Sequence, residues 1–250
     1  MLGTMKPTLS VVTGASRGLG HAVAVQLLAR GERLITVSRR APAGLSSPQL
    51  LHWDADLADA GAVARRLHDW LAAQGPQAFA AVNLINNAGV IAELAPMGNV
   101  ADADLTNAVR VGLEAPMRLT AAFLRATRGW PVPRKVVLVS SGLGRRAMAG
   151  SASYCAAKAG LDHLARALAL EEAARPGGAR IVSLAPGVID TDMQVQLRGA
   201  DRSRFPEGDR FEQLRTTGRL DSPEQAAAKV LAYLARPDFG STPVADVRDA

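Results

Sequence analysis

Short apolar runs alternate with longer amphipathic or alanine-rich segments along the whole chain, which predicts β-strands alternating with α-helices. The first unit has an apolar run at residues 9–13, a glycine-rich turn at 14–20 and a helix at 21–30 that Gly31 ends. A second apolar run follows at residues 34–37. Strand, helix and strand within about thirty residues form the βαβ unit of parallel sheets.

The same alternation continues along the chain, and the uninterrupted apolar run at residues 136–139 is typical of a parallel strand buried on both faces. The pattern is irregular only at residues 188–217; because long loops in compact domains often cover binding sites, we expect a substrate lid at 190–217. We predict an α/β fold, one doubly wound Rossmann domain over residues 1–250 with a central parallel sheet flanked by helices. The further strands are expected at residues 50–53, 81–85, 136–140, 181–185 and 244–247, and the further helices at 60–73, 103–127, 153–174 and 223–234.

Composition excludes several classes of protein. With 48% hydrophobic residues the chain is not a disordered one, and no apolar run approaches the ~20 residues of a membrane span. Cys155 is the single cysteine, so no internal disulfide forms, and the four histidines lack the spacing of metal ligands. Residues 1–10 lack the apolar stretch of a secretory signal. We expect a cytoplasmic protein without a metal and without a membrane partner.

The net charge of +6 is compatible with acidic partners, but the arginines are scattered rather than gathered in one stripe. The stretch at residues 198–219 alternates basic with acidic side chains, which indicates a solvated, self-paired surface. None of the three tryptophans lies in a basic segment. We therefore expect no nucleic-acid binding.

The turn after the first predicted strand reads Thr-Gly-Ala-Ser-Arg-Gly-Leu-Gly at residues 13–20. Glycines at this place let the backbone approach a pyrophosphate, which then binds at the N-terminus of the next helix. The glycine spacing differs from the common GxGxxG pattern, so a purely structural turn is the alternative. The position of the turn in the first βαβ unit favours dinucleotide binding.

The residues after the second predicted strand indicate which dinucleotide binds. A site for NAD places an acidic residue there to hold the ribose hydroxyls, but no carboxylate occurs between Arg33 and Trp53. The strand runs instead into Arg39, and Arg17 lies in the glycine turn. Because a guanidinium binds a 2′-phosphate as a planar, charge-assisted fork, these two residues predict NADP(H) as the cofactor. The alternative is that both arginines only face solvent.

Tyr154 and Lys158 lie four residues apart in a predicted helix and therefore share one face. A nearby ammonium stabilises the phenolate, so we expect it to lower the tyrosine pKa from ~10 toward the range of a working acid–base group. Ser141 directly follows a predicted strand, where catalytic groups of open α/β sheets gather, and can hydrogen-bond a substrate carbonyl. The alternatives for this role are Ser140 and two candidate helix caps, Ser151 and Ser153.

Taken in order, these motifs resemble the short-chain dehydrogenase/reductase family over residues 9–192. The matching segments include Asp-Leu at 56–57, Asn-Asn-Ala-Gly at 86–89 and Pro-Gly-Val at 186–188. The resemblance implies that Tyr154 is the general acid or base, that Lys158 lowers its pKa and binds the nicotinamide ribose, and that Ser141 orients the carbonyl. It implies these cofactor contacts: Gly14, Ser16, Arg17, Gly18, Leu19, Gly20, Arg39, Asp56, Leu57, Asn87, Ala88, Gly89, Tyr154, Lys158, Pro186, Gly187, Val188 and Thr191.

One position departs from the family pattern. The family usually carries an asparagine on its fourth helix, where it holds a water of the proton relay, and Gly112 stands in that place. Asn107 is five residues away and is expected to point to another side of a regular helix. The relay is therefore unassigned, and we expect Gly112→Asn to raise turnover.

The segments after residue 184 resemble the sepiapterin reductase and benzil reductase branch of the family. In sepiapterin reductases an aspartate of the tail anchors the pterin, and Asp246 falls on its place; the alternative is a surface residue that ends a strand. The resemblance implies an NADPH-dependent carbonyl reductase that transfers hydride to a ketone or a vicinal dicarbonyl. Its substrate contacts would be Ser141, Tyr154 and Asp246.

Two other functions stay open. A 3-oxoacyl carrier-protein reductase has an acidic partner, which would suit the net charge of +6. A non-catalytic NADP(H)-responsive regulatory protein agrees with the glycine at position 112. Family members commonly assemble through their long helices, so the alanine-rich helices at 103–127 and 153–174 lead us to expect a homodimer or homotetramer.

Overall fold

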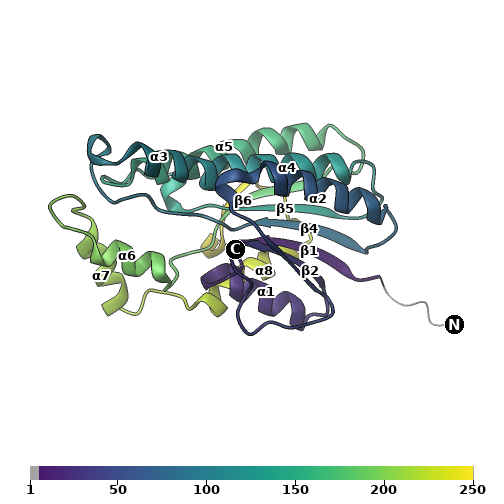
Figure 1. Ribbon diagram of the computed structural model, residues 1–250, viewed down its shortest axis with the longest axis horizontal. Helices are drawn as coiled ribbons and strands as arrows, with labels where there is room; N and C mark the ends of the chain where they lie inside the picture. Colours follow the sequence, from purple (N-terminus) through teal and green to yellow (C-terminus); the bar gives the residue numbers. More distant parts are fainter. Residues whose placement is uncertain (1–5, 250) are drawn as a thin grey trace.

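A parallel sheet forms the centre of the computed structural model, which describes residues 6–249 (Figure 1). Residues 1–5 and 250 of the predicted domain lie outside the described residues. The strands of the described part are β1 (Thr8–Thr13), β2 (Arg33–Ser38), β3 (Leu50–Asp54), β4 (Ala81–Asn86), β5 (Arg134–Val139), β6 (Arg180–Ala185) and β7 (Val244–Asp246). They lie in the order β3-β2-β1-β4-β5-β6-β7, and every neighbouring pair is parallel, which confirms the doubly wound α/β fold.

Helices cover both faces of this sheet (Figure 1). They are α1 (Gly18–Ala29), α2 (Ala60–Gln74), α3 (Asp102–Val109), α4 (Ala115–Ala126), α5 (Ala152–Ala173), α6 (Asp192–Gly199), α7 (Gly208–Thr216) and α8 (Pro223–Ala235). Most predicted strands and helices are confirmed, with shifts of a few residues at their ends. Among residues 6–249, no helix is both long enough and apolar enough to cross a membrane.

The core has two apolar halves, one on each face of the sheet. Because side chains alternate along a strand, Leu9 and Val11 of β1 pack with α2, α4 and α5, whereas Val12 packs with α1 and α8. Both faces of a central strand are therefore buried, which explains why the strands read as continuous apolar runs.

The start of α8 shows how the local sequence determines where a helix begins. Ser222 Oγ accepts a hydrogen bond from the backbone N–H of Gln225 (3.2 Å), and Gln225 Oε1 accepts one from the backbone N–H of Ser222 (2.9 Å). This capping box pairs N–H groups that a helix otherwise leaves free at its first turn. Pro223 suits the first helical position because no N–H is needed there.

The segment predicted to be irregular, residues 188–217, contains α6 and α7, so this part of the prediction is wrong. Helices of eight and nine residues with largely polar sequences give little periodic signal. Tertiary packing stabilises them instead. A separate apolar cluster joins this segment to the loop after β4 and to the loop before α5, and its buried members are Leu94, Met148, Leu197, Phe205 and Phe211.

The prediction of one continuous helix at residues 103–127 is also wrong, because this range contains two helices. A π-helical turn at Arg110–Glu114 separates α3 from α4. The backbone N–H of Ala115 donates to the carbonyl of Arg110, five residues back, instead of four as in an α-helix. The wider turn changes which side chains of the two helices share a face.

Candidate active site

A cavity of about 1100 Å³ opens at the carboxyl ends of the strands. The connections that leave β1 and β4 turn toward opposite faces of the sheet, and a crevice forms where they part. The cavity extends from this crevice to α6 and α7. All of the predicted cofactor-binding residues line it, from Gly14 to Thr191, and so do Ser141, Tyr154 and Lys158.

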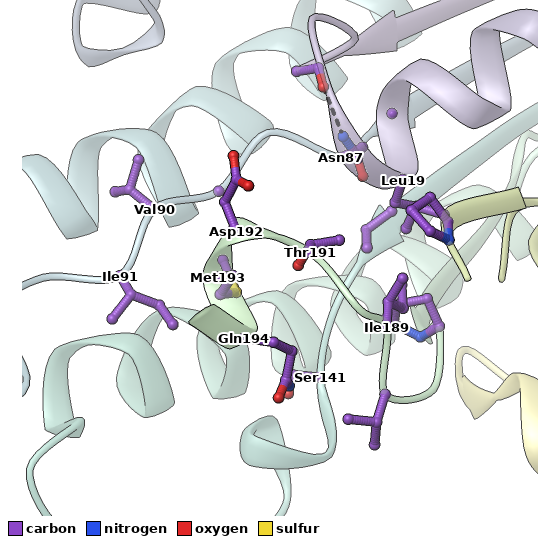
Figure 2. A pocket seen from close by; sticks show the side chains of 18 of the residues that line it. Leu19, Asn87, Val90, Ile91, Ser141, Ile189, Thr191, Asp192, Met193 and Gln194 are labelled. Atoms are coloured by element: carbon purple, nitrogen blue, oxygen red, sulfur yellow. Dashed lines mark hydrogen bonds between the residues drawn. The ribbon is translucent and has the colours of Figure 1, made fainter. Parts of the chain in front are cut away.

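The glycine-rich turn after β1 packs closely against the turn after β4. Gly14 has a φ of +69°, and a Cβ at this position would lie 2.8 Å from Cα of Ala88. The side-chain amide of Asn87 donates hydrogen bonds to the carbonyls of Thr13 (3.0 Å) and Gly14 (3.2 Å) (Figure 2). Thr13 Oγ1 accepts from the backbone N–H groups of Asn87 and Ala88, at 3.0 Å each. Position 14 therefore requires glycine, because a Cβ would collide with the backbone of Ala88. Position 87 requires a side-chain donor such as the asparagine amide.

The start of α1 fits an anionic dinucleotide. Gly18, Leu19 and Gly20 line the cavity, and within the described residues no side chain caps this helix start, so its N–H groups are free to bind a phosphate. The cavity wall as a whole carries eight basic and four acidic side chains. No three His, Cys, Asp or Glu side chains gather as metal ligands would anywhere in residues 6–249.

The two arginines predicted to bind a 2′-phosphate have different surroundings. Arg17 Nη1 donates to Oδ2 of Asp192 at 2.5 Å, and both side chains are exposed. Arg39 lines the cavity just after β2 and makes no ion pair or side-chain hydrogen bond within residues 6–249. Arg39 therefore has its whole guanidinium available to a phosphate. The guanidinium of Arg17 would instead be shared between a phosphate and the carboxylate of Asp192.

Tyr154 and Lys158 occupy the beginning of α5 and are both buried, with 9% and 4% of their surface exposed. Nζ of Lys158 lies 5.5 Å from the centre of the Tyr154 ring and donates a hydrogen bond to the carbonyl of Val139 (2.7 Å). A Cβ at Gly89 would lie 3.7 Å from this Nζ, so the glycine leaves space beside the ammonium. The ammonium is thus fixed between the end of β5 and the tyrosine ring.

Burial determines the pKa of both groups. It raises the pKa of Tyr154 to about 12, and the Ser141 hydroxyl offsets only part of this rise. It lowers the pKa of Lys158 to about 8, although the carboxylate of Asp162 acts in the opposite direction. The shift of the Tyr154 pKa is opposite to the one expected from the lysine alone, because loss of solvent disfavours the phenolate. At neutral pH the phenol is protonated and the ammonium is charged.

Ser140 and Ser141 both line the cavity, but the Ser140 hydroxyl is already committed to a carboxylate. Ser140 is 3% exposed and donates to Oδ1 of Asp162 at 2.7 Å. Ser141 Oγ accepts from the backbone N–H of Leu143 (3.2 Å), which leaves its O–H free to donate to a ligand. The two remaining alternatives lie away from the cavity wall: Ser151 and Ser153.

The aspartate predicted to anchor a substrate is held by a neighbouring arginine. Asp246 ends β7, is 4% exposed, and accepts from Nε (2.8 Å) and Nη2 (2.5 Å) of Arg248. Arg248 lines the cavity, whereas Asp246 is not part of its described wall. A substrate that binds Asp246 must displace the Arg248 guanidinium, so this assignment stays a prediction.

Several polar residues of the cavity wall were not assigned to the site from the sequence, among them Asn107 and Gln194. Asn107 was expected to point elsewhere, and the structure corrects this, because it lines the cavity just before the π-helical turn. Gln194 lies in the first turn of α6, after Thr191, and its side chain extends toward Ser141 (Figure 2). An N-cap signal at Thr191 would have revealed this helix start, but the tertiary fold decides which way the helix faces.

Comparison with known proteins assigns the family. Residues 8–202 match the family described as short chain dehydrogenase. The chain belongs to this family. Short-chain dehydrogenases are oxidoreductases that bind a nicotinamide cofactor and act on CH–OH or C=O groups.

Curated relatives narrow the position of this short-chain dehydrogenase within its family. Benzil reductase ((S)-benzoin forming) of Bacillus cereus is 33% identical, and the match covers 92% of this chain and 94% of that protein. Sepiapterin reductase of Meriones unguiculatus is 32% identical, with 99% of this chain and 98% of that protein covered. A short-chain dehydrogenase/reductase structure from Burkholderia vietnamiensis has 33% identity and a TM-score of 0.65, with 97% and 99% covered. The chain therefore lies in the benzil reductase and sepiapterin reductase branch.

Proposed function

We propose that this short-chain dehydrogenase is an NADPH-dependent carbonyl reductase that acts on a ketone or a vicinal dicarbonyl. The observation that carries the proposal is the convergence of Ser141, Tyr154 and Lys158 on one wall of the cavity that begins at the glycine turn. Two relatives that match nearly the whole chain are named benzil reductase and sepiapterin reductase.

NADP(H) is the cofactor that the end of β2 favours. Arg39 is free to form charge-assisted hydrogen bonds with a 2′-phosphate, and the chain has no carboxylate between residues 33 and 53 to hold the ribose hydroxyls of NAD. Asp56 lines the cavity farther along, but its carboxylate already accepts from the backbone N–H of Ala58 (2.9 Å). When bound, the nicotinamide supplies the hydride for the reduction.

The proposed roles of the side chains follow from their protonation. Tyr154 carries its proton at neutral pH and donates it to the substrate oxygen as a general acid. The Ser141 hydroxyl donates a hydrogen bond to the same oxygen and fixes the direction of the carbonyl. The Lys158 ammonium stabilises the phenolate that remains after proton transfer.

The outer part of the cavity suits an apolar substituent on the carbonyl. Leu143, Met193, Leu197 and Phe211 line it beneath α6 and α7. We propose that residues 190–217 act as the substrate lid, with these two helices as its body. An aromatic or aliphatic diketone would bury its substituents against this wall.

The first experiment compares NADPH and NADH oxidation with benzil, 2,3-butanedione and sepiapterin as substrates. Turnover with NADPH and a diketone would support the proposal. Turnover of a 3-oxoacyl thioester alone would support a carrier-protein reductase. Tight NADPH binding with no turnover of any of these carbonyls would support a regulatory protein.

Arg39→Ser tests the choice of cofactor. Loss of a charged hydrogen bond should raise the Kd for NADPH roughly 10- to 100-fold, with little change for NADH, measured by nucleotide fluorescence titration. Arg40→Ser is the matched control, because Arg40 is also exposed but lies outside the described cavity wall. Equal effects of the two variants would contradict the assignment.

Tyr154→Phe tests the general acid. The variant keeps the ring and should bind NADPH as the parent does, while the turnover number should fall by roughly a hundredfold or more. Stopped-flow measurement of NADPH oxidation would decide this. Retained turnover would show that another group donates the proton.

A further inference from the structure

A buried amide on α6 has no partner in the protein. Gln194 is 7% exposed, and its Oε1 is fully buried without a hydrogen bond to any described residue. Buried polar atoms are nearly always paired, and one left unpaired is destabilising. A leucine or methionine would fill the same place without this penalty. The amide therefore indicates a ligand group that pairs with it.

The fold holds this side chain against the reacting end of the cavity. Gln194 and Ser141 line the same cavity, and in Figure 2 the Gln194 side chain points from α6 toward Ser141. Its backbone N–H donates to the carbonyl of Thr191 (2.8 Å), which anchors the first turn of the helix. Leu197, one turn farther along α6, is buried against Phe205 and Phe211. The amide is thus kept inside the cavity and away from solvent.

We propose that Gln194 hydrogen-bonds the second oxygen of a vicinal dicarbonyl, while Ser141 and Tyr154 hold the oxygen of the carbonyl that is reduced. The inference rests on the proposed carbonyl reduction and specifies its substrate class. Gln194 is then a specificity-determining residue. Gln194 and Ser141 line the same cavity, so one substrate can present oxygens on neighbouring carbons to both side chains.

The chemistry of an amide suits this role. A half-turn about the last side-chain bond exchanges the carbonyl oxygen with the NH₂ group, so Gln194 can present an N–H donor to a ketone oxygen. The second carbonyl is unchanged when the first becomes a hydroxyl, and the product is an α-hydroxyketone. A monoketone has no second oxygen, so the amide stays unpaired when it binds. Enzymes reject analogues that lack one polar group through this kind of penalty in kcat/KM.

The test compares two substrates that differ by one oxygen, 1-phenyl-1,2-propanedione and 1-phenyl-1-propanone, in the holoenzyme and in Gln194→Met. We expect the variant to lose at least about tenfold in kcat/KM for the dione and to change little for the monoketone. Gln196→Met is the matched control, because Gln196 is exposed on the same helix and lies outside the described cavity wall. NADPH affinity and Tm, measured for each variant, separate loss of the contact from loss of the fold.

The outcomes separate this inference from the function on which it rests. If the parent protein reduces neither compound with NADPH nor with NADH, the proposed carbonyl reduction fails and the inference falls with it. Two results would refute the role of Gln194 while carbonyl reduction stands. In both, the parent reduces the dione; in the first, Gln194→Met lowers kcat/KM equally for the two compounds, and in the second it lowers kcat/KM for neither.

Gln194→Glu keeps the proposal falsifiable if the methionine variant does not fold. A carboxylate cannot donate a hydrogen bond, whereas a protonated carboxyl can. The ratio of dione to monoketone kcat/KM should therefore be low at alkaline pH and rise as the pH falls through the pKa of this carboxyl, an effect that the parent lacks. A ratio that does not depend on pH in the variant would overturn the inference.

Discussion

Lys158 is buried beside the Tyr154 ring, and burial holds its pKa at about 8, far below the ordinary value of a lysine. The ammonium is therefore charged below this pH and loses its proton above it. Asp162, one helical turn along α5, raises the pKa of Lys158 and thereby keeps the charge in place at neutral pH. Asp162 is itself held by hydrogen bonds from Ser140 and Ser183, at 2.7 Å each.

These surroundings predict a pH profile. The rate of carbonyl reduction should be nearly constant near pH 7 and fall as the pH rises past about 8, because the neutral amine no longer stabilises the Tyr154 phenolate. Asp162→Asn removes the carboxylate that raises the Lys158 pKa, so the fall should move to lower pH. The measurement is kcat against pH for both proteins.

Glu171→Gln provides the control for that profile, since Glu171 is an exposed carboxylate on the same helix and should leave it unchanged. A profile that is the same in Asp162→Asn as in the parent would show that the charge of Lys158 does not limit the reaction. Burial rather than sequence spacing determines the pKa here, so a tyrosine–lysine pair four residues apart does not by itself predict the direction of the tyrosine shift.

Among the elements, the joint between α3 and α4 departs most from what periodicity predicts. The π-helical turn at Arg110–Glu114 contains Gly112, which is buried against α5. A Cβ at Gly112 would lie 3.1 Å from Cβ of Ala157, closer than an ordinary contact. The glycine is therefore a point of close helix approach, directly beside the segment that carries Tyr154 and Lys158.

This contact revises the expectation for Gly112→Asn. The added side chain crowds α5, so the variant should lose about 1–3 kcal/mol of unfolding free energy and should not gain turnover. Ala157→Gly alone should cost about 1 kcal/mol as a glycine in a helix. The double variant should lose less than the sum of the two, because it removes the crowded Cβ. Denaturant unfolding and kcat of the four proteins test the cycle; strict additivity would show that the two sites do not interact.

At the scale of the whole molecule, the helical layer formed by α2, α3, α4 and α5 covers one face of the sheet, and the site opens at the end of that sheet (Figure 1). Leu170 on α5 is 76% exposed, more than any other large apolar side chain among the described residues. The predicted assembly through the long helices would cover this side chain.

We therefore expect a homodimer or homotetramer that Leu170→Glu weakens. Light scattering coupled to size-exclusion chromatography should show a lower average mass for this variant at the same concentration. Val25→Glu is the control, because Val25 is an exposed apolar residue (39%) on α1, in the opposite helical layer. A monomeric parent protein would contradict the predicted assembly, and equal effects of the two changes would contradict the choice of surface.

The sequence by itself determined the parallel sheet, its two helical layers and the cofactor-binding and catalytic part of the cavity wall. Continuous apolar runs can be buried only as central strands, and the glycine turn, the Tyr154–Lys158 spacing and Ser141 each follow from local backbone geometry. These features depend on residues close together in the chain, and the structure brings them to one edge because parallel strands end there.

Only the tertiary structure decided the rest. Leu197 and Phe205 are stabilised by residues at least 49 positions away, such as Met148 and Leu94, so α6 and α7 leave no periodic signal of their own. The direction of Asn107 depends on a π-helical turn, and the pKa of Tyr154 on its burial. Gln194 and Ser141 likewise share one cavity wall only because distant segments pack together. Such properties arise from packing between distant segments, which a local pattern cannot specify.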